Sequence, residues 1–241
     1  MGNAQGLLYN KKVFADAGVT ELPKTPDELI AALQAIKDNT DAIPMYTNYA
    51  AGWTMGGQWD AFLGAITTGD ETWLNQKFVH TAEPFKDNGD GTGAYALYKI
   101  LYDAVAGGLT EEDYTTTDWE GCKPAFGEGK IATMVLGSWA ITQFQEQAAD
   151  PSVVGYMPFP YSIDGKMYST SENDYCMSVN KNSQNIEAAK TFLFWFCTDS
   201  GFAASQGMIS ASRDAEMPET LKSFQDLGVE LIVKTAAPDE L

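Results

Sequence analysis

Residues 125–140 have the sequence AFGEGKIATMVLGSWA, and this stretch indicates the fold class more clearly than any other part of the chain. Within it, residues 130–136 form an apolar run of strand length with glycine on both sides. Ser138 is of a residue type that caps helices, so a helix is expected to begin at Trp139. The stretch predicts a buried strand followed at once by a helix, with Trp139 at the turn between them.

Short strands and helices alternate on both sides of this stretch. Residues 25–28 (TPDE) form a capping box with proline at the first helical position, and apolar residues follow at helical spacing. Residues 42–46 and 155–157 predict short buried strands, and residues 175–179 predict a further strand. Residues 189–196 have the apolar spacing of an amphipathic helix. Together these elements predict an α/β fold.

The composition is that of a folded protein with a strong negative charge. The chain has 241 residues, of which 44% are hydrophobic and 20% are charged, so it can bury a substantial core. Lys and Arg total 15 against 33 Asp and Glu, which gives a formal net charge of −18. A nucleic-acid partner needs a basic surface, and an anionic membrane would repel this chain. We therefore expect no nucleic-acid partner and a ligand that is neutral or cationic.

Few residues could bind a metal or a prosthetic group. His80 is the only histidine of the sequence, and Cys122, Cys176 and Cys197 are widely separated, with no CxxC pair. We therefore expect no metal, no cofactor and no disulfide framework. The sequence has no apolar run of about 18 residues, and its first ten residues lack the pattern of an export signal.

Three groups of segments together resemble the extracellular solute-binding proteins of the maltose-binding type. The first group is residues 6–19 (GLLYNKKVFADAGV) with residues 22–29 (LPKTPDEL), and the second is residues 125–140. The third and weaker group is residues 155–160 (GYMPFP) with residues 187–193 (EAAKTFL). The segments occur in the order found in that family and together extend over most of the chain.

The resemblance implies an α/β, periplasmic-binding-protein-like type II clamshell, mostly its second lobe with a return segment of the first. Residues 1–156 would form the second lobe, largely complete, and residues 157–212 would be the return segment. Residues 213–241 would be an acidic tail, a hinge segment or a return to the second lobe. Such a protein binds a mono- or oligosaccharide without catalysis and delivers it to the permease subunits of an ABC importer. The full-length protein would be extracellular, anchored to a membrane as a lipoprotein, or periplasmic.

The chain departs from the family pattern at its beginning. Family members begin in the first lobe, whereas this sequence begins where the chain crosses into the second. We therefore expect the opening part of the first lobe, the signal peptide and the lipoprotein cysteine to be missing, in a fragment or in a naturally short form. An orphaned return segment would expose apolar surface and favour a homodimer or a domain swap.

The loop from Asn48 to Asp60 combines the residue types that a sugar site needs. Sugars have apolar faces ringed by hydroxyls, so their receptors combine flat aromatic rings with amides and carboxylates. In the family the matching loop contributes a stacking aromatic residue, for which Trp53 or Tyr49 is the nearest match, with loop packing as the alternative. Trp59 is a further candidate, but its helical spacing to the apolar residues that follow equally favours a core position.

Two further positions complete the candidate ligand-binding residues. The family places a stacking tryptophan where Trp139 stands, and burial within the core is the alternative. Asp174 and Tyr175 precede the strand expected to return to the first lobe, so they would lie near the cleft, or else serve as a hinge or turn. Trp119 is expected to pack within the fold rather than to bind ligand.

Two other functions stay open on the sequence alone. A carbohydrate-active enzyme would use a pair of Asp and Glu side chains, and the 33 acidic residues do not exclude one. A truncated interaction module would bind a partner protein through the exposed face between the lobes and would bind no sugar.

Overall fold

The structure, a computed structural model, describes residues 1–212 and 214–238, apart from the side chains of residues 61–63 and 172. Of the expected segment 213–241, Arg213 and residues 239–241 therefore lie outside the described residues. Within the described part, the fold is α/β and is built on a seven-stranded sheet. The strands are β1 (Gly2–Asn10), β2 (Ile43–Met45), β3 (Ile131–Gly137), β4 (Val154–Pro158), β5 (Ser162–Ile163), β6 (Lys166–Asn173) and β7 (Glu230–Val233).

β1 lies at the centre of the sheet. It pairs antiparallel with β3 along one side and with β4 along the other, and β2 pairs in parallel with β3. Every residue of β3 is buried, as expected for a strand covered on both faces. The strands predicted at residues 130–136, 42–46 and 155–157 are thereby confirmed.

Helices cover both faces of this sheet. The α-helices are α1 (Lys11–Asp16), α2 (Pro26–Asn39), α3 (Gly93–Ala106), α4 (Trp119–Gly127), α5 (Ala140–Gln147), α6 (Ile186–Thr198), α7 (Phe202–Ser205) and α8 (Lys222–Asp226). The short 3₁₀ and π turns are η1 (Tyr49–Ala51), η2 (Thr54–Leu63), η3 (Gly64–Thr67), η4 (Trp73–Lys77), η5 (Phe78–His80), η6 (Tyr114–Thr116), η7 (Pro151–Val153) and η8 (Glu219–Leu221). The predicted cap of α2 is confirmed, because the Thr25 hydroxyl accepts a hydrogen bond of 3.3 Å from the backbone N–H of Glu28.

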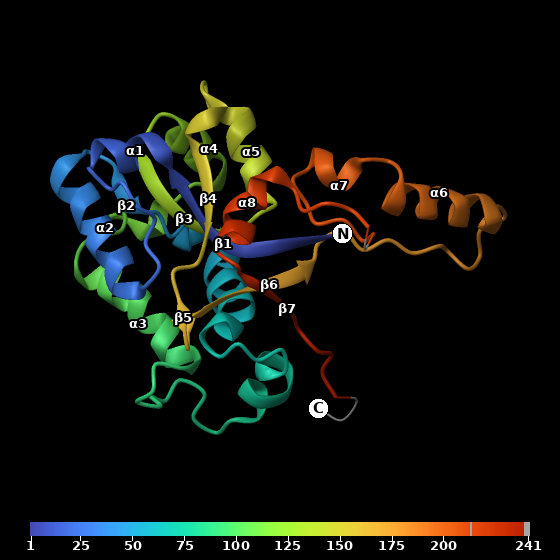
Figure 1. Cartoon of the computed structure of the whole chain (residues 1–241), viewed down its shortest axis with the longest axis horizontal. Helices are drawn as coiled ribbons and strands as arrows, with labels where there is room; N and C mark the ends of the chain where they lie inside the picture. The colour runs from blue at the N-terminus through green and yellow to red at the C-terminus, as the bar shows by residue number, and fades with distance from the viewer. Residues whose placement is uncertain (213, 239–241) are drawn as a thin grey trace.

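The alternation of side chains along the strands produces two cores. Leu7 of β1 and Val135 of β3 face the core beneath α1, α2 and α3. Leu8 and Leu136, the next residues along each strand, face the core formed with α4, α5 and α8. Figure 1 shows these two groups of helices on different sides of the sheet.

A smaller strand group continues from the start of β1. Residues 2–4 of β1 pair antiparallel with residues 171–173 of β6, and β6 also pairs with β5 and, in parallel, with β7. The chain therefore stays paired to the central sheet beyond residue 156, where the sequence placed the end of the second lobe. β7 and α8 return to the same body, and Phe224 of α8 is buried in its core.

The strand predicted at residues 175–179 is wrong. The pairing of β6 with β1 ends at Asn173, and the backbone N–H of Asp174 donates to the Met1 carbonyl over 3.1 Å. Residues 174–180 then run without regular secondary structure to α6, which extends away from the body of the molecule (Figure 1). The helix predicted at residues 189–196 is confirmed as α6, although none of its residues is buried.

Helix α6 presents large apolar side chains to solvent on several sides. The exposed fractions of Phe192, Phe194 and Trp195 are 55%, 69% and 49%. No helix in the described part of the chain combines the length and hydropathy needed to cross a bilayer.

Candidate functional site

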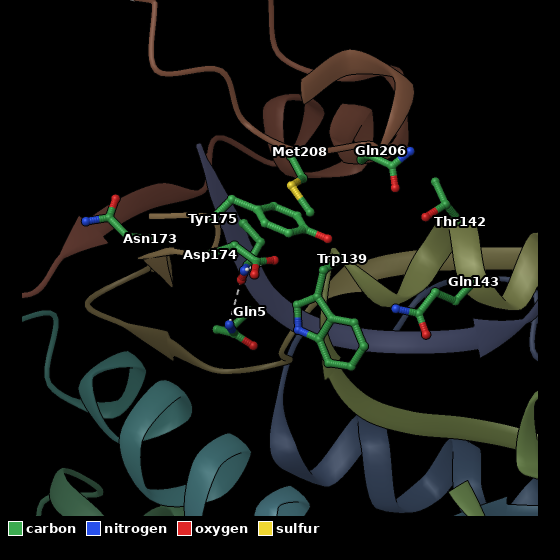
Figure 2. Close-up of a pocket in the computed structure, with 10 residues that line it drawn as sticks. Gln5, Trp139, Thr142, Gln143, Asn173, Asp174, Tyr175, Gln206 and Met208 are labelled. Carbon is green, nitrogen blue, oxygen red and sulfur yellow. Dashed lines mark hydrogen bonds between the residues drawn. The ribbon is translucent and has the colours of Figure 1, made fainter. Parts of the chain in front are cut away.

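A cavity of about 250 Å³ opens where the start of β1, the start of α5 and the segments on either side of α6 and α7 meet. Figure 2 shows side chains from these separate segments projecting toward the same space. The residues that line it are Asn3, Gln5, Trp139, Thr142, Gln143, Asn173, Asp174, Tyr175, Gln206 and Met208. Three of the residues predicted from the sequence, Trp139, Asp174 and Tyr175, are therefore brought together here.

Trp139 is fixed at the junction of β3 and α5. The expected capping role of Ser138 is wrong, because its hydroxyl accepts a hydrogen bond of 3.1 Å from the backbone N–H of Ala4. The Ser138 N–H donates in return to the Ala4 carbonyl over 2.8 Å, so the turn is joined to β1 rather than to its own helix. Trp139 itself is the N-cap residue of α5 and is half-buried. This turn presents the indole at the cavity.

Trp139 belongs to a cluster of three tryptophans. Its ring centroid lies 5.8 Å from that of Trp53 and 5.8 Å from that of Trp119. Trp53 and Trp119 meet edge to face at 5.1 Å, a favourable arrangement for aromatic pairs. The ammonium group of Lys123 lies 4.7 Å from the Trp119 ring centroid. Trp119 thus contacts both candidate platforms, which is the packing role expected of it.

Trp53, a member of this cluster, and Tyr49, in the same loop, lie on the surface. Their exposed fractions are 39% and 50%, so both have ring area free for a ligand. Tyr49 contacts Tyr114 edge to face with centroids 5.1 Å apart. The aromatic surface predicted in this loop therefore continues from the tryptophan cluster toward Tyr114.

Asn48 is directed inward, although it was predicted at the site. It is fully buried, its φ is +54°, and its Nδ2 and Oδ1 atoms have no hydrogen-bond partner among the described residues. The left-handed conformation suits asparagine and begins η1, which carries Tyr49. Asn48 therefore shapes the loop rather than lining the cavity.

Trp59 and Asp60 lie outside the cavity, in the core between η2 and α3. Trp59 is 2% exposed, and its ring meets Phe159 edge to face at 5.8 Å. The Asp60 carboxylate accepts a hydrogen bond from the Tyr98 hydroxyl. Burial and this carboxylate together raise the pKa of Tyr98 well above its usual range. The core alternative is thus the one found for Trp59, because its ring has no free face for a sugar.

Asp174 and Tyr175 follow the end of β6 and border the cavity. Asp174 accepts a hydrogen bond of 3.3 Å from the Asn3 side chain. The Tyr175 ring meets Phe202 of α7 edge to face at 5.6 Å and points toward the cavity (Figure 2). Both residues thus lie at the point where the chain leaves the central body.

The sequence interpretation missed the floor of the cavity. Asn3 and Gln5 are two residues apart in β1, so their side chains lie on the same face of the strand. Polar residues at this spacing in an otherwise apolar and buried strand are a signal that could have identified them. Asp174 is the one acidic residue among the described residues lining the cavity, which include no lysine. Within the described part of the chain, no group of histidine, cysteine and acidic side chains could hold a metal ion.

The comparisons with known proteins agree with this fold. Residues 1–201 match the profile of the bacterial extracellular solute-binding proteins. The chain belongs to this family, which confirms the resemblance drawn from the sequence.

A relative of known function is the diacetylchitobiose binding protein DasA of Streptomyces coelicolor. It is 29% identical over 211 residues, which are 84% of this chain and 46% of the relative. The chain spans about half the length of the curated relatives it matches.

Two solved structures from Bifidobacterium animalis subsp. lactis are more similar in sequence. The manno-oligosaccharide specific solute-binding protein BlMnBP2, in complex with mannotriose, is 48% identical with a TM-score of 0.89. The ABC transporter binding protein BlMnBP1, in complex with mannobiose, has the same identity and TM-score. Each match covers 99% of this chain and 56% of the other chain. The predicted fold class is thereby confirmed, as a part of the fold of sugar-binding proteins.

Proposed function

We propose that this chain supplies the larger part of an oligosaccharide-binding site in an extracellular solute-binding protein. Its ligand is a manno-oligosaccharide of two or three sugar units, held by stacking on Trp139 and by hydrogen bonds from the polar floor of the cavity. Trp53, Tyr49 and Tyr175 offer further ring faces along the same surface. The manno-oligosaccharide assignment rests on the likeness to two proteins that bind such ligands.

The observation that carries the proposal is the combination of ring faces and amides around one open cavity. Trp139 and Tyr175 border the same space as Gln5 and Gln143. Apolar ring faces pair with the C–H faces of a sugar, and amides with its hydroxyls. The cavity is also free of lysine among the described residues, which fits a neutral ligand better than an anionic one.

The protein binds its ligand without catalysis. A glycosidase places two carboxyl groups on opposite sides of the scissile bond, about 5–10 Å apart. Among the described side chains that line this cavity, Asp174 is the one carboxylate. A binding role also explains the exposed aromatic surface, since closure over the sugar would cover it.

The complete protein passes its ligand to the permease subunits of an ABC importer. This partner follows from the transporter association of the similar protein BlMnBP1. The protein acts outside the cytoplasm, as its family does, and a lipoprotein anchor would keep it at the membrane.

Isothermal titration of the chain with mannobiose and mannotriose tests the proposal, with maltotriose and diacetylchitobiose as competing ligands. We expect saturable binding of the manno-oligosaccharides, and at least a tenfold weaker affinity in Trp139→Ala. Tyr102→Ala on α3 is the matched control, because Tyr102 is 70% exposed and does not line the cavity.

Each of three results would contradict the proposal. If Trp139→Ala bound the sugar with the same heat and affinity as the wild-type chain, the sugar would bind elsewhere. Release of mannose from mannotriose would favour the carbohydrate-active enzyme. No binding of any of the four sugars, by a chain that unfolds cooperatively, would favour an interaction module.

A further inference from the structure

A chain of three polar side chains forms the floor of the cavity. The Gln5 Nε2 atom donates to Asn3 Oδ1 over 2.8 Å, and Asn3 Nδ2 donates to Asp174 Oδ2 over 3.3 Å. Gln5 and Asn3 are 1% and 4% exposed, whereas Asp174 is exposed. The chain therefore runs from the buried strand β1 to the rim of the cavity, with every bond donated in the same direction.

The carboxylate fixes this direction. A carboxylate accepts hydrogen bonds and donates none, so Asn3 must turn its NH₂ group toward Asp174. The carbonyl oxygen of Asn3 must then face Gln5, which in turn must present its own NH₂ group. The orientation of both amides thus follows from the charge of one side chain.

One acceptor is left over at the buried end of the chain. The Oε1 atom of Gln5 is buried and has no hydrogen-bond partner among the described residues. Buried acceptors without a partner are rare in folded proteins, because they forfeit the hydrogen bonds that they make with water. Gln5 also lines the cavity, so its side chain borders the space that a ligand would occupy.

We propose that Gln5 is a specificity-determining residue that accepts a hydrogen bond from one hydroxyl of the bound sugar, with its amide held in the accepting orientation by Asn3 and Asp174. This inference rests on the proposed function and adds to it which partner donates and which accepts in one hydrogen bond. The ligand hydroxyl must donate at this point, so a group that only accepts does not replace it. Asn3 acts through Gln5 and is a positioning residue.

Single-site analogues of mannotriose test the proposal. A deoxy analogue lacks the hydroxyl, and a deoxyfluoro analogue carries at the same carbon a fluorine that cannot donate. We expect one position of the sugar at which both analogues bind the wild-type chain about 10 to 100 times more weakly than mannotriose. At a hydroxyl that only accepts, the fluoro analogue would bind better than the deoxy analogue.

Gln5→Met is the decisive variant, because methionine has a similar length and no strong acceptor. It should bind mannotriose about 10 to 100 times more weakly, yet bind the two analogues as well as it binds mannotriose. A variant that only loosened the fold would instead weaken all three ligands and keep the discrimination between them. Thermal unfolding of the free variant checks that it is folded.

Asp174→Asn tests the directing role of the carboxylate. An amide at this position can donate to Asn3, which allows the whole chain to reverse and Gln5 to present its NH₂ group. We therefore expect the variant to bind the fluoro analogue at least threefold better, relative to the deoxy analogue, than the wild-type chain does. Discrimination that is unchanged in both variants would overturn the inference while leaving the proposed function intact. Failure of the wild-type chain to bind any sugar would overturn both.

Discussion

A Cβ atom placed on Gly137 would lie 2.6 Å from both the Cδ1 and Nε1 atoms of Trp139, and 3.0 Å from Oδ1 of Asn3. Packing therefore requires a glycine at the end of β3. The backbone conformation does not require one, because the φ of Gly137 lies outside the left-handed region. It leaves room for the indole to lie against the end of the strand, next to the polar floor of the cavity. The sequence motif Gly-Ser-Trp thus positions the aromatic ring as well as ending the strand.

Replacing Gly137 with alanine should displace Trp139 and weaken sugar binding. The added methyl group cannot be accommodated without moving the indole, and overpacking of this kind costs about 1–3 kcal/mol. We expect a lower melting temperature, a shifted tryptophan emission spectrum and about a tenfold weaker affinity for manno-oligosaccharides. Fluorescence spectroscopy and calorimetric titration measure these effects.

Gly56→Ala is the matched control for this substitution. Gly56 also has an ordinary φ, and a Cβ atom placed there meets no atom within 4 Å. Its emission spectrum and affinity should equal those of the wild type. Equal effects of the two substitutions would show that the contact with Trp139 has no consequence.

Trp119 should contribute to ligand affinity through the orientation of its neighbours. Its ring contacts with Trp53 and Trp139 are each worth about 0.5–1.5 kcal/mol beyond buried area. We expect Trp119→Leu to lower stability by about 2 kcal/mol and to weaken sugar binding about threefold to tenfold. A double-mutant cycle with Trp139→Ala separates the two effects, because the loss in affinity should become smaller when Trp139 is absent. Additive losses in the cycle would contradict this coupling.

Trp53 and Trp59 lie in the same loop region but should respond differently to truncation. Trp59→Ala removes a side chain that is 2% exposed and should destabilise the fold by about 3–5 kcal/mol. Trp53→Ala removes a ring that is 39% exposed and should cost about 1 kcal/mol of stability while weakening sugar binding. Urea unfolding and titration calorimetry distinguish the two. A large loss of stability in Trp53→Ala would show that its ring serves packing.

This contrast shows where the sequence was informative and where it was not. Local patterns were sufficient for the strand at residues 130–136, for the cap at Thr25 and for the position of Trp139 at a turn. These features depend on neighbours in the sequence, through glycine, capping residues and apolar runs. The position of Trp59 could not be decided in this way, since its helical spacing favours a core position as much as a place at the site. Only the packing of α3 and Phe159 against Trp59 decides which ring is buried.

The strand predicted at residues 175–179 is absent for a related reason. Residues 175–179 have the composition of a strand, but a strand also needs a neighbour with which to pair. The neighbouring strand β1 provides partners as far as Asn173, so regular pairing ends there. The cavity floor formed by Asn3 and Gln5 likewise depends on tertiary structure, because β6 and α5 bring Asp174 and Trp139 to the same side of β1.

The three cysteines should differ in their reactivity toward alkylating reagents. Burial raises the pKa of the Cys122 thiol to about 12, whereas Cys176 is exposed. The thiolate is the reactive form, so at pH 8 only about one Cys122 in ten thousand would be ionised. We expect Cys176 to react first, Cys197 more slowly, and Cys122 only after unfolding. Raising the pH from 7 to 9 should still leave Cys122 unreactive in the folded chain.

Mass spectrometry after timed labelling with iodoacetamide measures this order. The Cys176→Ser variant is the control and should lose the fast phase alone. Rapid labelling of all three thiols in the folded chain would contradict the buried position of Cys122.

Helix α6 should cause this 241-residue chain to self-associate. Phe192, Phe194 and Trp195 are about half exposed or more, and apolar side chains grouped in this way favour association. The net charge of −18 opposes it, so added salt should strengthen the association by screening the repulsion. Sedimentation velocity at 5–100 µM should show a concentration-dependent dimer that Phe194→Glu weakens at least tenfold, because the new carboxylate would be buried in the contact. Tyr102→Glu, which places the same charge on an exposed position of α3, should leave the dimer unchanged. A chain that remains monomeric at 100 µM in high salt would contradict this role of α6, as would a dimer that responds equally to the two substitutions.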